Sequence, residues 1–184
     1  MDNVMNVEMK FKELIKYIAS RSISDEYFGA TKLNKILFFC DFLAYRDLGK
    51  SISGEGYHKE PFGPVPNHIN KAIKEMKSSN DIAEVNCPLG SYTQRKIVSL
   101  TDVDLDIFSP REISLIDNVI DSLRGATATE VSDLSHKFIG WQLAEQGEDI
   151  PYEVSLLSET TVTEDDIEYG NALLKELENN SVLT

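Results

Sequence analysis

The sequence lacks an apolar run as long as the ~18 to 20 residues that cross a membrane. Its most apolar stretch, LNKILFFCDFLAY, is interrupted by Lys35 and Asp41. The N-terminal residues MDNVMNVEMKFKEL show no basic end followed by an apolar block, so we expect no secretory signal. These absences predict a cytoplasmic protein without a membrane partner.

Cysteine is also scarce, and the two cysteines, Cys40 and Cys87, occupy unlike contexts. Cys40 falls in an apolar helical pattern, whereas Cys87 precedes Pro88 in a turn-like segment. Neither belongs to a C-x-x-C pair, so we expect no disulfide framework, which agrees with a reducing cytoplasm. Burial in so apolar a helix would raise the pKa of the Cys40 thiol, and we therefore interpret Cys40 as a core residue and not as a nucleophile.

Motifs for catalysis and cofactor binding are missing as well. No serine stands in a G-x-S-x-G pattern, and Gly54 and Gly56 lack the spacing of a phosphate-binding loop. The histidines His58, His68 and His136 do not pair with a second ligand at helical spacing. The DVDLD segment at 102–106 lacks the glycine and the terminal glutamate of a calcium-binding loop. We expect no metal, no cofactor and no enzymatic activity.

Basic residues are scarce in the second half of the chain. Residues 1–100 carry 14 Lys and Arg and 12 Asp and Glu, whereas residues 101–184 carry 4 and 19, within a total net charge of −13. An acidic half repels nucleic acid and membrane surfaces and attracts basic partners. A surface that only keeps the protein soluble is the simpler interpretation, and both stay open.

Hydrophobic periodicity predicts helices near residues 6–20, 32–46 and 67–79. The second is apolar on nearly every side, which is typical of a central core helix, and Thr31 is its expected N-cap. A short strand is expected at residues 57–60. Segments 81–85 and 95–100 are expected to form two further strands joined by the connection NCPLGSYTQ.

Two later helices carry capping signals. Ser109 with Glu112 forms the first capping box, and Thr127 with Glu130 forms the second. A last, acidic helix is expected after Thr163. The predicted fold is a single compact domain, mainly α with a small antiparallel β-hairpin (α+β). Residues 1–30 would be an N-terminal helix and linker, 31–160 the core, and 161–184 an acidic C-terminal helix packed on that core.

The tryptophan, Trp141, lies just beyond the end of the helix that begins at Thr127. His136 lies near that end, beside an apolar stripe that includes Leu134 and Ser135. We expect His136 to bond a carbonyl of the next turn, and Trp141 to fold back over the helix end as a structural anchor. The alternative is a binding hot spot, in which tryptophan and tyrosine are enriched.

Three segments together resemble a known family. KLNKILFFCDFLAYRDLGKSI is similar to the early core helix of the Panacea domain, the SocA-like antitoxin family. EPFGPVPNHI resembles that family's Gly-Pro-Val turn, and ATEVSDLSHKFIGWQLAEQGEDIPYE resembles its Leu-Ser-His segment with a downstream tryptophan. The segments follow the family's order and span residues 31–155. The matched positions are Lys32, Leu33, Lys35, Phe62, Gly63, Pro64, Leu134, Ser135, His136 and Trp141.

The resemblance implies an antitoxin without catalytic residues, which neutralises a cognate toxin by direct protein contact. It also implies, from at least one relative, a proteolytic adaptor that delivers its toxin to a cellular protease. The acidic second half leads us to expect a basic toxin. The candidate toxin-binding residues are Phe62, Pro64, His136, Trp141 and Tyr152.

A DNA-binding transcriptional regulator is the alternative, because a helix followed by a two-stranded hairpin, as expected over residues 67–99, also ends a winged-helix module. The candidate nucleic-acid-binding residues are Lys71, Lys74, Lys77, Arg95 and Lys96. Non-specific DNA affinity comes from neutralising phosphates, for which this chain has few positive charges. We therefore expect no tight sequence-specific DNA binding by the chain alone.

Overall fold

The computed structural model describes residues 2–90 and 92–157. The helices of this part are α1 (Asp2–Arg21), α2 (Ala30–Leu48), α3 (Ile69–Ser78), α4 (Pro110–Leu123), α5 (Ala128–His136) and α6 (Ile139–Leu143). The strands are β1 (Tyr57–His58), β2 (Val65–Pro66), β3 (Ile82–Leu89) and β4 (Tyr92–Ser99), and two short 3-10 helices are η1 (Leu105–Ile107) and η2 (Tyr152–Leu156). The predicted, mostly helical α+β fold is confirmed. The expected helix after Thr163 lies outside the described residues.

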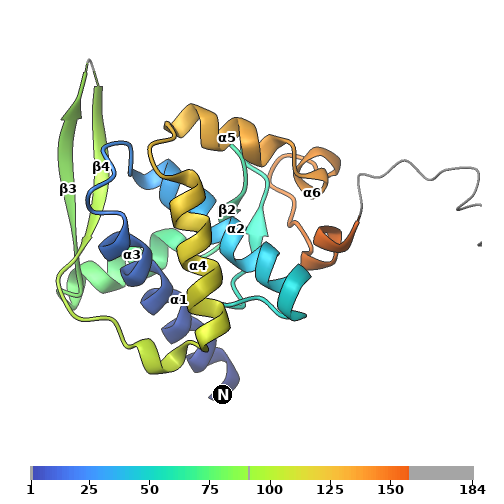
Figure 1. The fold of residues 1–184 in the computed structure, drawn as a ribbon, viewed down its shortest axis with the longest axis horizontal. Helices are drawn as coiled ribbons and strands as arrows, with labels where there is room; N and C mark the ends of the chain where they lie inside the picture. The colour runs from blue at the N-terminus through green and yellow to red at the C-terminus, as the bar shows by residue number, and fades with distance from the viewer. Residues whose placement is uncertain (1, 91, 158–184) are drawn as a thin grey trace, which may run out of the picture.

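The helices gather around α2, and the β3–β4 hairpin stands at one side of them (Figure 1). Helices α1, α4 and α5 contact α2, and so do β2, β4 and η2. Both sheets are antiparallel pairs, β1 with β2 and β3 with β4. None of the helices in residues 2–90 and 92–157 is long and apolar enough to cross a membrane.

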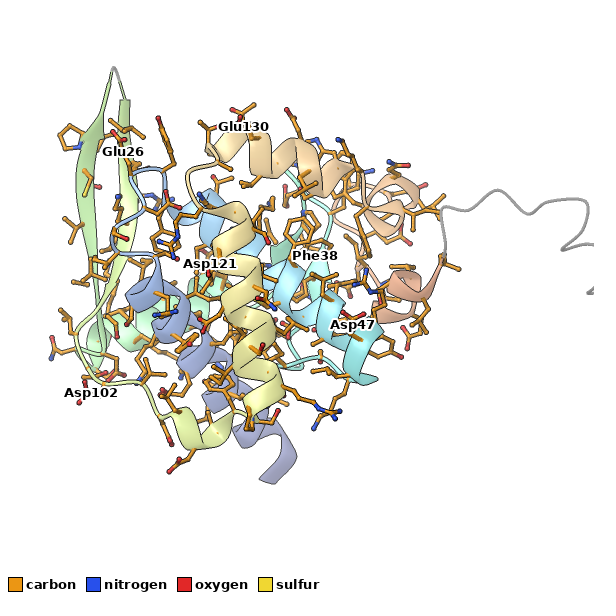
Figure 2. The ribbon with its side chains drawn as sticks, in the orientation of Figure 1. Glu26, Phe38, Asp47, Asp102, Asp121 and Glu130 are labelled. Atoms are coloured by element: carbon orange, nitrogen blue, oxygen red, sulfur yellow. The ribbon has the colours of Figure 1, made fainter. Side chains whose placement is uncertain are left out.

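The core forms around α2 because apolar side chains surround most of this helix. Phe38 and Phe42 are buried and pack against each other with ring centroids 4.4 Å apart. Phe138, which follows α5, packs edge-on against both rings. Phe38 lies at the centre of the molecule, whereas Asp102 and Glu130 project from its rim (Figure 2). Burial of Cys40 raises the pKa of its thiol well above the ordinary value, as expected of a core cysteine.

Three charged residues of α2 are nevertheless buried: Lys32, Lys35 and Asp41. The Lys32 ammonium donates to a carboxylate oxygen of Asp25 at 2.6 Å and to the carbonyl of Ala126 at 2.7 Å. The Lys35 ammonium donates to the carbonyl of Pro64 at 2.9 Å. Because a buried charge without partners is costly, each of these residues fixes a connecting segment against the helix.

Asp41 organises the connection that follows α2. Its carboxylate accepts hydrogen bonds from the backbone N–H of Ser53 at 2.7 Å, from the Ser53 hydroxyl at 2.5 Å and from the Tyr57 hydroxyl at 2.7 Å. Burial raises the pKa of Asp41 to about 6, although hydrogen bonds from Ser53 and Tyr57 act in the opposite direction. Desolvation therefore outweighs three donors at this site.

Both capping boxes are present, at Ser109 with Glu112 and at Thr127 with Glu130. The expected cap at Thr31 was wrong, because α2 begins earlier and its N-cap is Gly29. The connection expected between residues 85 and 95 was also wrong, since β3 and β4 extend through it to a turn at Gly90. The long ladder of hydrogen bonds overrides the turn-forming composition of this segment.

Strand β2 and helix α6 had no clear signal in the sequence, because each is too short to show a period. Leu134 was expected in the apolar stripe of α5, but 43% of it is exposed. The stripe that packs inward is instead formed by Val131, Ser132 and Ser135. Small side chains let α5 approach α2 closely.

We expect Asp41 to lower stability as the pH rises. Its pKa is about 6 in the folded state, against 3.8 for an exposed aspartate, so between roughly pH 4 and 6 the folded state binds more protons than the unfolded state. From about pH 4 to 7, the free energy of unfolding of the wild type should fall by about 3 kcal/mol relative to that of Asp41→Asn. Chemical denaturation of both proteins measures this difference, and a difference independent of pH would contradict it.

Candidate functional site

The segment after α6 pairs with strand β1. The Lys59 N–H donates to the carbonyl of Glu148, and the Gly147 N–H donates to the carbonyl of Lys59, both at 2.9 Å. The Ile150 N–H donates to the carbonyl of Tyr57 at 2.7 Å. Residues 57–63 and 136–150 are thereby held together, and we refer to these two segments as the Trp141 corner.

The Trp141 side chain is fixed from three directions. The His136 ring stacks on it, with centroids 4.0 Å apart and planes inclined by 17°. The Lys59 ammonium lies 4.3 Å from the centroid of the Trp141 ring and also donates to the carbonyl of Ala144 at 2.9 Å. The indole N–H donates to the carbonyl of Glu60 at 3.1 Å. Trp141 therefore joins α6 to the loop after β1, as a structural anchor does.

The role expected for the His136 ring was wrong. Its Nε2 atom is buried and has no hydrogen-bond partner among the described residues, so the ring does not bond a carbonyl of the next turn there. Its main interaction is the stack on Trp141. An aromatic neighbour replaces the carbonyl because α6 begins almost immediately after α5 and brings Trp141 back over the helix end.

Three segments far apart in the sequence meet at Gly63. This glycine has a φ of +98°, and a Cβ atom added to it would collide with the Ser135 hydroxyl and lie 2.5 Å from Cε of Lys35. The next residue, Pro64, is buried, and its carbonyl accepts a hydrogen bond from the Lys35 ammonium. Burial of Lys35 lowers the pKa of its ammonium group to about 8. A glycine is required here by both the backbone conformation and the lack of space.

The five candidate toxin-binding residues differ in exposure. Phe62 is 74% exposed, whereas Pro64 is buried beneath the turn, and His136 and Trp141 are half-buried against each other. Tyr152 is half-buried among aromatic rings: it stacks on Tyr45 with centroids 5.5 Å apart, and its hydroxyl donates to the carbonyl of Glu55. Burial is also the main cause of the raised pKa of the Tyr152 hydroxyl. Phe62 is thus the candidate residue whose side chain a partner could reach most fully.

Sequence reasoning missed Leu143, which belongs to the same corner. It ends α6, next to the carbonyl that accepts Lys59, and it is 70% exposed. The sequence offered only one hint, namely that Leu143 lies two residues after Trp141. The helix that exposes Leu143 is too short to be recognised from the sequence. The corner therefore presents two large apolar side chains, Phe62 and Leu143, on segments tied together by hydrogen bonds.

The candidate nucleic-acid-binding residues lie around α3 and the β3–β4 hairpin, in the expected order of helix and hairpin. Lys77 and Arg95 both pair with Glu84, at 2.8 and 3.2 Å, and these contacts lower the pKa of the Glu84 carboxyl. Lys96 turns away to the carbonyl of Asp25. Lys71 lies near the carboxylates of Glu8 and Glu75, at 3.6 and 3.8 Å. Most of these cations already have acceptors within the chain.

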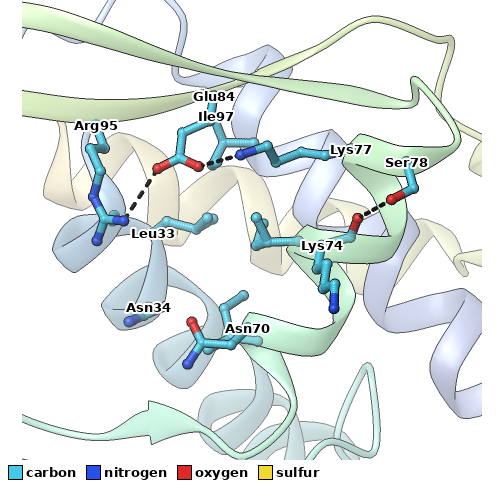
Figure 3. A pocket seen from close by; sticks show the side chains of 12 residues that line it. Leu33, Asn34, Asn70, Lys74, Lys77, Ser78, Glu84, Arg95 and Ile97 are labelled. Carbon is cyan, nitrogen blue, oxygen red and sulfur yellow. Dashed lines mark hydrogen bonds and ion pairs between the residues drawn. The ribbon is translucent and has the colours of Figure 1, made fainter.

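Lys74, Lys77 and Arg95 line a groove of about 450 Å³, which we call the α3–hairpin groove (Figure 3). Its floor is apolar and includes Ile73 and Ile97. Among the described residues, no group of three or more His, Cys, Asp and Glu side chains is placed to hold a metal ion.

The class that fold and site define is a compact α+β domain that presents an exposed apolar corner built on a buried turn. A family model, described as the antitoxin SocA-like Panacea domain, matches residues 33–142, and the chain belongs to this family. The matched region contains most of α2, the Gly63–Pro64 turn, α5 and Trp141, and in the structure α2, this turn and α5 meet at Gly63. No curated protein and no solved structure matches the chain.

Gly63→Ala is expected to lower the free energy of unfolding by about 3 kcal/mol, because the added methyl group meets both a strained backbone and two packed side chains. Gly49→Ala is the matched control. Gly49 has a φ of +77° at the end of α2, but no atom lies within 4 Å of its Cβ position, so this substitution should cost only about 1 kcal/mol. Thermal or urea unfolding compares the two, and equal losses would contradict the packing argument.

Trp141→Ala is expected to lower the free energy of unfolding by about 2 to 4 kcal/mol, because it removes the stack on His136 and the bond to Glu60 together. Trp141→Phe retains a ring for the stack but loses the indole donor, and should cost about 1 kcal/mol. Urea denaturation measures both losses. A Trp141→Ala protein that is as stable as the wild type would identify the ring as a partner contact instead of an anchor.

Proposed function

We propose that this protein is an antitoxin that neutralises a toxin by direct binding, and that the Trp141 corner is the contact surface. Membership of the SocA-like family supports an antitoxin role in general. The main support for this choice of surface is that Phe62 is 74% exposed and is followed immediately by the buried Gly63–Pro64 turn. A large aromatic side chain exposed on a rigid support loses little conformational entropy on binding, as an interface hot spot requires.

The two segments that carry Phe62 and Leu143 also carry polar groups. Glu60 and Gln146 are hydrogen-bonded to each other at 2.9 Å, and Lys59 is held over the Trp141 ring. An apolar centre with a polar rim is the usual arrangement of a protein–protein interface. Within the corner His136 stacks on Trp141, while the Pro64 carbonyl bound to Lys35 and the Tyr152 hydroxyl bound to the Glu55 carbonyl fix the chain on either side of residues 57–63.

A basic toxin is the partner that the charge of the chain favours. The total net charge is −13, and residues 101–184 carry 19 Asp and Glu but only 4 Lys and Arg. Opposite charge accelerates encounter and helps to select the partner, whereas the apolar centre would supply most of the affinity. The acidic cluster Glu164–Asp166 belongs to the same half of the sequence but lies outside the described residues.

A proteolytic-adaptor form of this function would have the bound toxin delivered to a cellular protease. The half-life of the toxin in cells distinguishes the two forms. Neutralisation by binding alone leaves or lengthens the toxin half-life, whereas an adaptor shortens it in the presence of the protease.

Phe62→Asp and Leu143→Asp are each expected to abolish rescue of growth when the protein is co-expressed with the toxic product of a neighbouring gene. With purified partners, each should weaken binding by about 30-fold or more, because a charge replaces a central apolar contact. Both side chains are highly exposed, so the free energy of unfolding should change by less than ~0.5 kcal/mol.

Ile23→Asp is the matched control, since Ile23 is 56% exposed in the connection between α1 and α2, away from the corner. It should rescue growth as the wild type does. Full rescue by both corner variants would exclude the Trp141 corner as the toxin-binding surface.

A further inference from the structure

The α3–hairpin groove is separate from the Trp141 corner and has a different chemical character. It lies between α3 and the β3–β4 hairpin, and Leu33 and Asn34 from the first turns of α2 also line it (Figure 3). Leu33, Ile73 and Ile97 contribute apolar atoms to its lining. An apolar floor of this kind accepts an aliphatic side chain.

Positive charge lines the groove, although the chain as a whole is acidic. Lys74 and Lys77 come from α3 and Arg95 from β4, and Glu84 is the acidic residue among the lining residues. Glu84 lies between Lys77 and Arg95 and pairs with both. Among the described residues, the Lys74 ammonium takes part in no ion pair. The lining therefore carries three cations against one carboxylate and has charge available for an anionic ligand.

Two asparagine side chains add a preference for polypeptide. Asn34 and Asn70 line the groove, and neither is bonded to another of the residues drawn in Figure 3. A side-chain amide offers both a donor and an acceptor, which matches a peptide group, whereas a phosphodiester offers acceptors alone. The Glu84 carboxylate would repel a closely spaced row of phosphates but leaves room for isolated carboxylates beside Lys74. The combination of apolar floor, amides and separated cations thus fits an acidic peptide better than nucleic acid.

We propose that the α3–hairpin groove binds an acidic, partly aliphatic peptide segment of a protein partner. One carboxylate would pair with Lys74, further carboxylates would share Lys77 and Arg95 with Glu84, and an aliphatic side chain would contact Ile73 and Ile97. This site does not depend on toxin binding at the Trp141 corner, and it stands or falls separately from the antitoxin proposal.

The test is fluorescence anisotropy with the full-length protein and a labelled peptide of about 12 residues in which Glu and Asp alternate with Leu. A second peptide replaces Glu and Asp with Gln and Asn, and a duplex DNA of about 20 base pairs represents nucleic acid. Saturable binding of the acidic peptide is expected. The neutral peptide and the DNA should each bind at least about tenfold more weakly at physiological salt.

Lys74→Glu should weaken binding of the acidic peptide by about tenfold or more, because it reverses the charge that faces the open groove. Lys71→Glu is the matched control: it makes the same charge change at another exposed position of the same helix, but Lys71 does not line the groove. It should change the affinity by less than about twofold, since the surrounding salt screens exposed charges. Circular dichroism checks that both variants fold.

Each contrary result overturns the proposal. Absence of saturable binding up to about 1 mM peptide would show that the groove does not take this class of ligand. Equal losses of peptide affinity in Lys71→Glu and Lys74→Glu would show that the peptide responds to the overall charge of the protein and not to the groove. Tighter binding of the DNA, lost in Lys74→Glu, would assign the groove to nucleic acid.

Discussion

The structure depends on the burial of three charged side chains along a single core helix. Removing an ion from water costs several kcal/mol unless other groups replace its hydration. Lys32 and Lys35 therefore require carbonyl and carboxylate oxygens, and Asp41 requires hydroxyl and N–H donors. These partners come from connecting segments, which are drawn onto α2 at fixed points along its length. The hydrophobic contacts of α2 favour a compact domain, while its charges determine where each loop must lie.

The Trp141 corner is a product of that arrangement. Lys35 holds Pro64, so the Gly63 turn is fixed above α2 and beside Ser135 of α5. The same turn carries Phe62 outward, and the backbone pairing of residues 147–150 with β1 holds α6 next to it. The α3–hairpin groove arises in another way, from a helix and a hairpin that approach each other but leave an open lining. The described residues thereby form an exposed apolar corner and a groove lined by cations, built in two different ways.

The sequence was sufficient for the parts of the fold in which local signals agree with tertiary packing. The period of apolar residues located α1 to α4, and the boxes at Ser109 and Thr127 located the starts of α4 and α5. It failed where long-range contacts decide, as in the extended β3 and β4 and in α6, which is only five residues long. At the candidate site, the sequence identified Phe62 and Trp141 but not Leu143. Side-chain exposure depends on how segments pack, and no pattern of spacing reveals that Pro64 lies inside while Phe62 lies outside.

Two adjacent residues of this loop differ in how strongly their surroundings restrict substitution. A side chain at Gly63 would collide with Lys35 and Ser135, whereas Phe62 is in contact mainly with solvent. Substitutions at the exposed position should cost little stability, whereas a side chain at Gly63 would disturb the packed core. If the exposed residue contacts the toxin as proposed, single substitutions there could change the partner while each variant still folds.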